Sequence, residues 1–224
     1  MKTLNWLLLI IVFLSCGPSP SNFSESELSL LKNLQFEQGV LSNLKQDIHT
    51  EFTQFEISDP GYIIRSDGEK EKTGVEKKNG ISFKVPEKQS DKVILNHKDY
   101  LKQNGYLIFL SESGYESPSI ISIIKAEDKF DILRIQKTDG INFDLENDDI
   151  IKRLKIWDET YGIEILGADY DWVDFIFIKD IKNPSEFAQE VYDFCPDSVD
   201  QGVGEITILE QILQQEKRLF LWWD

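Results

Sequence analysis

The densest group of potential ligand atoms in this sequence is a run of acidic and amide side chains between residues 142 and 149. Carboxylate and carboxamide oxygens are the ligands that Ca²⁺ prefers, so a calcium site is one interpretation. The run lacks the central glycine and the closing glutamate of an EF-hand loop. Acidic residues also stabilise the first turn of a helix through its dipole, and we favour this second explanation. The side chains concerned are Asn142, Asp144, Glu146, Asp148 and Asp149.

Cys195 is the second candidate for chemistry and one of two cysteines in the chain. A nucleophilic thiolate needs a base or a positive environment that lowers its pKa. Asp193 and Asp197 flank this thiol and would raise its pKa instead, and both histidines lie in the first half of the chain. The helical spacing from Val191 and Phe187 therefore predicts that Cys195 is a small, buried core residue.

Other patterns for catalysis are missing from the sequence. It contains no zinc-ligand spacing, phosphate-binding loop, dinucleotide fingerprint or serine-nucleophile elbow, and we expect no metal and no cofactor. A carboxylate pair for hydrolysis stays open, because such a pair is defined by its separation in space. The chain has many acids, and the sequence gives no reason to select two of them. Asp169, Asp171 and Asp174 surround a predicted hairpin turn, as turn residues or as a second oxygen site.

The N-terminus is typical of an export signal. Lys2 precedes an apolar run at residues 6–14, which is too short to cross a bilayer because a spanning helix needs about 20 apolar residues. The run ends in Ser15 and Cys16, and this ending resembles the signal of bacterial lipoproteins.

The resemblance implies removal of residues 1–15 as a signal peptide and attachment of lipid to Cys16, which anchors the protein to a membrane of the cell envelope. Residues 16–26 would then form a polar tether. Gly17 follows the lipidated cysteine, which favours the outer membrane over the inner one. The alternative is an ordinary secreted protein.

The composition limits the partners of the folded part. The chain has 40 acidic and 24 basic residues and a formal net charge of −16. Nucleic acids and anionic lipid surfaces require a cationic protein surface, so we expect neither to bind the protein surface. If lipid occupies Cys16, Cys195 has no partner for a disulfide bond, and the fold depends on packing alone.

Residues 27–80 are predicted as an N-terminal extension. Apolar residues at three- and four-residue steps indicate a helix from Ser26 to Ile48. Alternation at residues 52–57 indicates a strand, residues 59–61 a turn, and the charged run at residues 66–79 a loop or hairpin tip.

Residues 81–224 are predicted as one α+β domain, a mixed sheet with helices packed on it. Asn147 is expected to cap one helix, and residues 219–223 are apolar on both faces, which predicts a central C-terminal strand. We expect strands at 81–85, 106–110, 120–125, 163–166 and 172–178, and helices at 90–104, 147–161, 184–195 and 206–213. Residues 130–135 fit either a short helix, which we favour, or a strand.

From about Tyr100 to its end the chain resembles an uncharacterised bacterial family, the domain of unknown function 4253. The segments that carry the resemblance are Lys129–Arg134, Thr138–Asn142, Phe194-Cys195-Pro196-Asp197, Gln201-Gly202 and Trp222-Trp223-Asp224. The family has no established activity, so the resemblance implies a domain and not a reaction.

Seven polar or aromatic residues within these segments are candidates for binding a ligand or a partner. Two of them, Trp222 and Trp223, should point to opposite faces of their strand. The alternative is that the residues near the C-terminus only tie a loop to the last strand. The candidates are Asp139, Asn142, Asp197, Gln201, Trp222, Trp223 and Asp224.

Together these observations favour a non-enzymatic binding or interaction module, tethered to the membrane outside the cytoplasm. One specific version is an immunity-type protein that neutralises a basic toxin, because an acidic inhibitor attracts a basic partner and needs no catalytic groups. The alternative is a hydrolase that uses acidic residues such as Asp139 or Asp197.

The lipid anchor gives a first testable prediction. Cells that make the protein should incorporate radioactive palmitate into it, and Cys16→Ala should abolish this incorporation because the sulfur is the atom that receives the lipid. Labelling followed by gel autoradiography measures the effect, and equal incorporation by the two forms would refute the anchor.

Overall fold

The computed structural model describes residues 22–58, 62–64, 70–72, 74–114 and 117–223, so the predicted signal, Cys16, the turn at 59–61 and Asp224 lie outside the described residues. The strands are β1 (Thr53–Ile57), β2 (Tyr62–Ile64), β3 (Lys70–Lys72), β4 (Glu76–Val85), β5 (Tyr106–Glu112), β6 (Ser119–Lys125), β7 (Ile163–Ala168), β8 (Trp172–Phe177) and β9 (Arg218–Trp222). The helices are α1 (Glu25–Asn33), α2 (Gln38–Asp47), α3 (Ser90–Gln103), α4 (Asp131–Gln136), α5 (Asn147–Tyr161), α6 (Pro184–Phe194) and α7 (Ile206–Gln215). Shorter turns are the 3₁₀ segments η1 (Glu87–Gln89) and η2 (Ile141–Phe143) and the π-helical segment η3 (Ser198–Val203).

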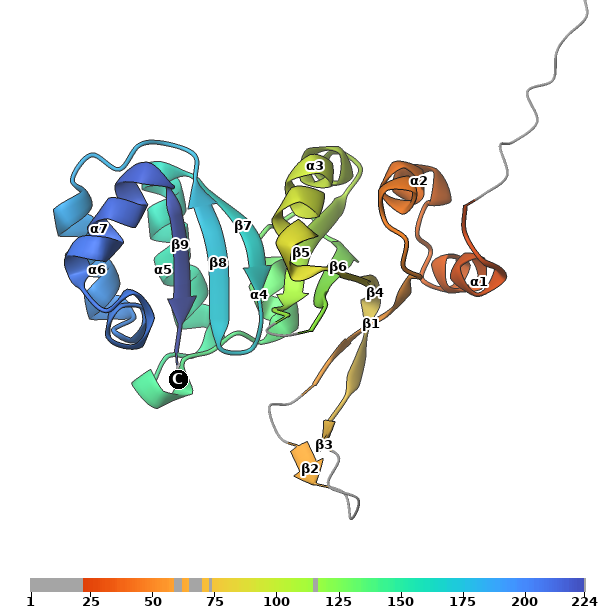
Figure 1. The fold of residues 1–224 in the computed structure, drawn as a ribbon, viewed down its shortest axis with the longest axis horizontal. Helices are drawn as coiled ribbons and strands as arrows, with labels where there is room; N and C mark the ends of the chain where they lie inside the picture. The colour runs from red at the N-terminus through yellow and green to blue at the C-terminus, as the bar shows by residue number, and fades with distance from the viewer. Residues whose placement is uncertain (1–21, 59–61, 65–69, 73, 115–116, 224) are drawn as a thin grey trace, which may run out of the picture.

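A seven-stranded sheet in the order β1-β4-β6-β5-β7-β8-β9 runs through the molecule (Figure 1). Neighbouring strands are antiparallel except for β5 and β7, which are parallel. The mixed sheet with helices packed on it confirms the predicted α+β class, and the strands and helices expected within residues 81–213 are present with small shifts at their ends. The expected boundary between residues 80 and 81 falls inside β4, so the N-terminal extension shares this sheet.

The single helix predicted for residues 26–48 is in fact two helices, α1 and α2. The chain breaks at Gln35, which has a left-handed φ of 58°. Phe36 then turns inward, where its ring lies 5.1 Å from that of Tyr106. The break lets Leu31 of α1 and Leu41 of α2 both become fully buried against the sheet.

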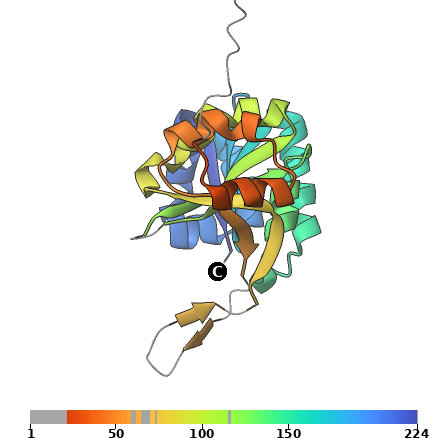
Figure 2. The same ribbon diagram turned by 90° about the vertical axis from the view of Figure 1, so that its right-hand side faces the viewer.

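Helices cover the two faces of the sheet at different places. α1, α2 and α3 pack on β4, β6 and β5 (Figure 2), whereas α4, α5, α6 and α7 pack on the opposite face, over β5, β7, β8 and β9. On the α3 side of β8 and β9, Trp172 and Asp174 are buried, and Asp91 at the start of α3 accepts a hydrogen bond from Arg218 of β9 at 2.6 Å (Figure 1). Among the described residues, no helix is both long and apolar enough to cross a bilayer.

The prediction that the C-terminal strand is central is wrong, because β9 lies at an edge of the sheet. Its side chains alternate, so that Leu219 and Leu221 are buried in the core while Phe220 is 48% exposed. On the other side of the sheet from Leu219 and Leu221, Phe220 stacks on Trp172 of β8, with ring centroids 5.6 Å apart. Phe220 and Trp172 therefore pack on each other on the α3 side of the sheet.

The opposite edge carries an arm that projects from the body (Figures 1 and 2). β1 and β4 form its base, and the antiparallel pair of β2 and β3 forms its tip. β4 begins at Glu76, within the charged run predicted as a loop or hairpin tip. Charged residues can form a strand here because both faces of a projecting ribbon contact water.

Glu27 joins the N-terminal helices to the sheet. Its carboxylate is 99% buried and accepts hydrogen bonds from Lys45 Nζ at 2.6 Å and from the main-chain nitrogens of Phe52 at 2.8 Å and Ser24 at 2.7 Å. Burial alone would raise the pKa of Glu27, but these hydrogen bonds outweigh it and hold the pKa below 4.5. The carboxylate is thus a charged, fully bonded link between α1, α2 and β1.

Replacement of this carboxylate should weaken the N-terminal half. Glu27→Gln should lower the free energy of unfolding by about 3 kcal/mol at neutral pH, because it leaves the Lys45 ammonium buried without its counter-charge. A pKa that is lowered in the folded state adds stability above the ordinary pKa, and this is lost as the pH falls through the folded-state value. The difference between the two forms should therefore shrink below about pH 4.5.

Urea unfolding between pH 3 and 7 measures both effects. Glu25→Gln is the matched control, because Glu25 is exposed in the first turn of the same helix and should change stability by less than about 0.5 kcal/mol. A constant difference between wild type and Glu27→Gln across this pH range would contradict the assignment.

Candidate functional site

The segment Thr138–Asn142 forms a loop fixed by its own main chain and by neighbours. α4 ends at Gln136, and Lys137 follows in the left-handed region with a φ of 58°. The main-chain nitrogen of Thr138 then donates to Leu133 O at 3.1 Å, and the Thr138 hydroxyl donates to Asp169 O at 2.7 Å. These bonds hold the loop against the turn between β7 and β8.

Asn147 fixes the same loop from the other side. Its amide donates to Leu133 O at 2.9 Å and to Thr138 O at 2.8 Å. The prediction that Asn147 caps its helix is therefore wrong, and Glu146 holds the cap position with Asp149 in a reciprocal capping box. The geometry favours Glu146 because the Asn147 side chain is already used to close the loop.

The turn between β7 and β8 joins this loop to the C-terminal strand. The main-chain nitrogen of Asp139 donates to Tyr170 O at 2.8 Å, and that of Trp223 donates to Asp171 O at 2.9 Å. Trp222 Nε1 donates to the Asp171 carboxylate at 3.3 Å. Three segments far apart in the sequence thus meet at one end of the sheet.

A pocket of about 320 Å³ lies where these segments meet, and we call it the Asp139 pocket. It brings together three of the predicted residues, Asp139, Asn142 and Trp223, and reaches a fourth, Trp222, through Asp171. Its complete lining is Ile57, Ser58, Gln136, Lys137, Asp139, Ile141, Asn142, Tyr170, Asp171 and Trp223.

Trp223 forms the buried wall of the pocket. The indole is 3% exposed, lies against Gly140, and meets the ring of Phe194 edge-on at 5.8 Å. Trp222 and Trp223 point to opposite faces of the sheet, as predicted. Trp223 Nε1 has no hydrogen-bond partner among the described residues, although burying an unpaired donor costs about 1–3 kcal/mol.

The charge of the pocket is negative. Asp139 and Asp171 contribute carboxylates, and Asn142 contributes a carboxamide. Lys137 Nζ is paired with Glu76 Oε2 at 3.1 Å, so its charge is already compensated. The aromatic and aliphatic walls suit the carbon chain of a lysine or arginine whose charged end reaches the carboxylates.

Asp197 and Gln201 do not line this pocket. Asp197 is buried directly before η3, and Gln201 is exposed within η3. Cys195 links η3 to the last strand, β9. Its thiol donates to Trp222 O at 3.1 Å and lies 3.0 Å from Ser198 Oγ, so it joins η3 to β9.

Cys195 is fully buried, as predicted, and burial raises the pKa of its thiol above the usual value. A thiol in this state is a poor nucleophile. The acids between residues 142 and 149 also have structural roles, since Glu146 and Asp149 cap α5. Within the described residues, no three or more histidine, cysteine, aspartate or glutamate side chains converge as metal ligands.

Sequence reasoning missed several residues of the pocket. Asp171 appeared among the acids of the hairpin turn but had no feature that separated it from Asp169 and Asp174. Gln136 and Ile57 carried no signal, because Gln136 lies in a short helix and Ile57 ends a strand far away in the sequence. Only the three-dimensional structure could place them beside Asp139.

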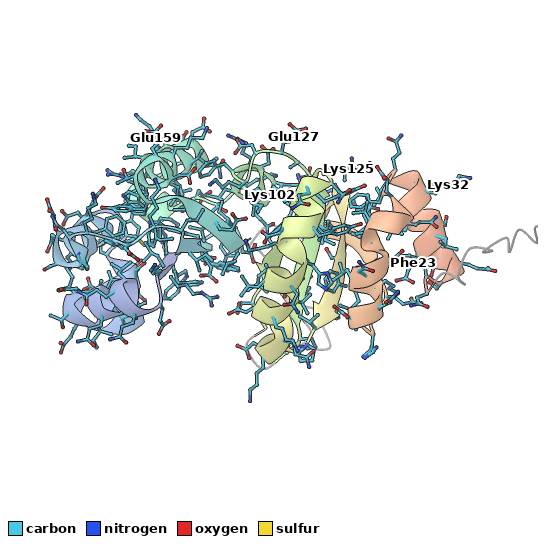
Figure 3. The ribbon with its side chains drawn as sticks, turned by 90° about the horizontal axis from the view of Figure 1, so that it is seen from above. Phe23, Lys32, Lys102, Lys125, Glu127 and Glu159 are labelled. Carbon is cyan, nitrogen blue, oxygen red and sulfur yellow. The ribbon has the colours of Figure 1, made fainter. Side chains whose placement is uncertain are left out.

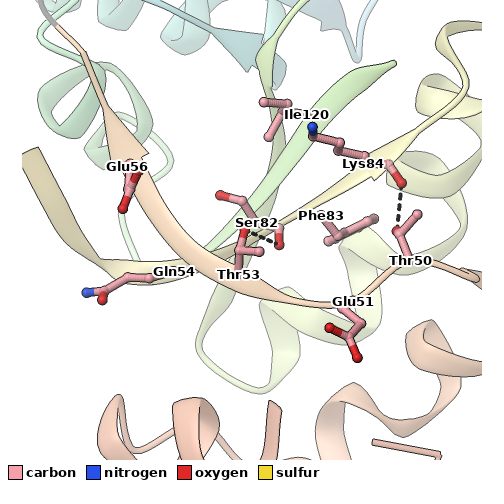
Figure 4. Close-up of a pocket in the computed structure, with 9 residues that line it drawn as sticks. All are labelled: Thr50, Glu51, Thr53, Gln54, Glu56, Ser82, Phe83, Lys84 and Ile120. Atoms are coloured by element: carbon pink, nitrogen blue, oxygen red, sulfur yellow. Dashed lines mark hydrogen bonds between the residues drawn. The ribbon is translucent and has the colours of Figure 1, made fainter. Parts of the chain in front are cut away.

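A second hollow, of about 270 Å³, lies between β1 and β4 (Figure 4). Its hydroxyls serve the fold: Thr50 Oγ1 donates to Lys84 O at 2.7 Å, and Thr53 Oγ1 donates to Ser82 O at 3.3 Å. Ser82 Oγ lies 2.7 Å from Ser122 Oγ. Because these polar groups are already bonded, the Asp139 pocket is the better candidate for binding.

The contact between Gly140 and Trp223 gives a prediction. A Cβ at position 140 would lie 2.9 Å from Trp223 Cγ, and the buried indole has little room to move. Gly140→Ala should lower the free energy of unfolding by about 1–3 kcal/mol and shift the tryptophan fluorescence.

Gly39→Ala is the matched control, because nothing lies within 4 Å of a Cβ built there and the residue is helical. It should stabilise the protein by about 0.5–1 kcal/mol. Equal stability of the two variants in urea unfolding would show that the indole does not occupy the described position.

Comparisons with known proteins agree with the segments noted in the sequence. A family model described as "Domain of unknown function (DUF4253)" matches residues 120–224. No curated protein and no solved structure matches the chain. The matched segment contains every residue of the Asp139 pocket except Ile57 and Ser58. Residues 120–224 of this chain are therefore similar to the DUF4253 family, as the segments noted in the sequence predict.

Proposed function

We propose that this protein is a lipid-anchored binding module outside the cytoplasm, and that it holds a basic partner protein in the Asp139 pocket without catalysing a reaction. The observation that carries the proposal is the convergence of Asp139, Asn142 and Asp171 around one pocket with aromatic and aliphatic walls. A basic side chain of the partner would place its charge between the carboxylates and its carbon chain along the walls. An immunity-type protein that neutralises a basic toxin is the specific version we favour.

The net charge of −16 supports a basic partner, because it would speed the encounter of the two proteins at low salt.

One observation favours the alternative of a hydrolase, namely that Asp139 and Asp171 line the same pocket. Such an enzyme would need one carboxylate free to act on substrate, whereas Asp171 already accepts a hydrogen bond from Trp222. Asp197, the other acid considered for hydrolysis, does not line this pocket. We therefore favour binding over hydrolysis.

Photo-crosslinking in living cells tests the proposal with the full chain. A photo-reactive amino acid replaces Ile141, which lines the pocket and is 77% exposed. Irradiation should yield one main adduct with a protein of high isoelectric point. Combining this probe with Asp139→Asn and Asp171→Asn should lower the yield about tenfold or more, because the charges that hold the basic side chain are removed. High salt during irradiation of cell extracts should lower it as well.

Glu127→Gln with Glu159→Gln is the matched control, since it removes the same number of negative charges elsewhere. Both side chains lie on the surface near α3 and the end of α5 (Figure 3). Glu159 lies about 18 Å along α5 from Asn147, which holds the pocket loop. An adduct that survives the pocket substitutions, or that falls equally in the control, would rule out the pocket as the binding site.

A further inference from the structure

We propose that the Asp139 pocket recognises two opposite charges of its partner, a basic side chain and a carboxylate that lies close to it in the partner's chain. The basic group would bind Asp139 and Asp171, and the carboxylate would bind Lys137, which lines the same pocket. This inference rests on the proposed function and names the local chemistry that the partner must present.

Two lysines share one carboxylate beside the pocket. Lys78 Nζ lies 2.5 Å from Glu76 Oε1, and Lys137 Nζ donates to Glu76 Oε2 at 3.1 Å. The pKa of Glu76 lies below its usual value, first because of the hydrogen bond from Lys78 and then because of that from Lys137. One carboxylate neutralises one ammonium group, so these three side chains keep one positive charge. Glu76 therefore compensates Lys137 only in part.

Lys137 is the lysine of this pair that a ligand can reach. Its side chain is 59% exposed and lines the pocket, whereas that of Lys78 is 16% exposed. Both ends of the Lys137–Glu76 ion pair are fixed by the sheet. Glu76 of β4 lies opposite Ile57 of β1, another residue of the lining, and Lys137 follows Gln136, whose side chain is bonded to β5 and β7. The ammonium group is thus held beside the pocket.

The pocket therefore presents separated charges. Asp139 and Asp171 are half-buried, whereas Lys137 is exposed at the rim. A ligand with only a basic group would be attracted by the two carboxylates and repelled by the ammonium group, while a ligand with both charges would satisfy each of them. A carboxylate within two residues of the basic residue lies at most about 7 Å from it along the chain. An acidic neighbour or the partner's C-terminal carboxylate provides this chemistry.

Two small probes that differ in one charge test the inference on the full-length protein. Nα-acetyl-arginine carries a guanidinium and a free carboxylate, and its methylamide carries the guanidinium alone. NMR titration of the ¹⁵N-labelled protein measures both dissociation constants. The acid should bind about threefold more tightly than the methylamide, which is the effect of one exposed ion pair. Without a contact to Lys137 the order should be the reverse, because the net charge of −16 repels the carboxylate.

Lys137→Gln should remove the preference for the acid. Lys182→Gln is the matched control, since Lys182 is exposed, carries the same charge and follows the end of β8 that is remote from Asp171. This control should keep the preference. In the crosslinking assay Lys137→Gln should lower the yield of the Ile141 adduct about threefold, although it makes the pocket more negative. Mass spectrometry of the crosslinked peptide then distinguishes an acidic neighbour from a C-terminal carboxylate, and a captured segment with neither would overturn the inference.

The outcomes separate this inference from the proposed function. Tighter binding of the methylamide by wild type, or a higher adduct yield with Lys137→Gln, would overturn the inference and leave a pocket for a purely basic group. Binding of neither probe at about 20 mM, above the millimolar dissociation constants expected for so small a ligand, would also overturn it. The proposed function fails separately, if the Ile141 adduct survives Asp139→Asn with Asp171→Asn.

Discussion

The junction between β5 and β7 is the constraint on which the rest of the structure depends. The seven-stranded sheet is continuous only because these two parallel strands meet, and the pairing is short, with Leu110 opposite Gly167. A Cβ at position 167 would lie 2.8 Å from Leu110 Cβ, so the close approach requires glycine. Gln136 bridges the same junction, because its Nε2 donates to Ser111 O of β5 at 3.1 Å and to Ala168 O of β7 at 2.6 Å.

This junction also creates the site. Gln136 ends α4, and the loop that carries Asp139 leaves immediately after it. Ala168 ends β7, and the turn with Asp171 follows. The bridge therefore fixes the starting points of two of the three segments around the pocket. A shift of β7 along β5 would separate Asp139 from Asp171 before it exposed much of the core.

Local patterns in the sequence predicted most of the elements, because helices and strands bury apolar residues with periods that can be counted. The predictions failed where contacts between distant residues determine the local structure. Leu31 and Leu41 fit one helical stripe, yet the break at Gln35 depends on the Tyr106 ring, which receives Phe36. The apolar Phe220 suggested that both faces of the last strand are buried. In the structure β9 is an edge strand, and Phe220 packs there by stacking on Trp172. For the site, the sequence supplied Asp139, Asn142 and Trp223 but not Gln136 or Ile57, since a pocket partner from another strand leaves no local pattern.

The limits of the family match have a structural consequence. The matched residues 120–224 contain β6, β7, β8 and β9 but not β5, which lies between β6 and β7 in the sheet. The matched segment alone would thus lack the strand that joins its two parts, so the N-terminal half is needed to complete the fold. The same half supplies Ile57 and Ser58 to the Asp139 pocket. The pocket therefore depends on both parts of the chain, because the matched segment carries its carboxylates and the N-terminal half completes its wall.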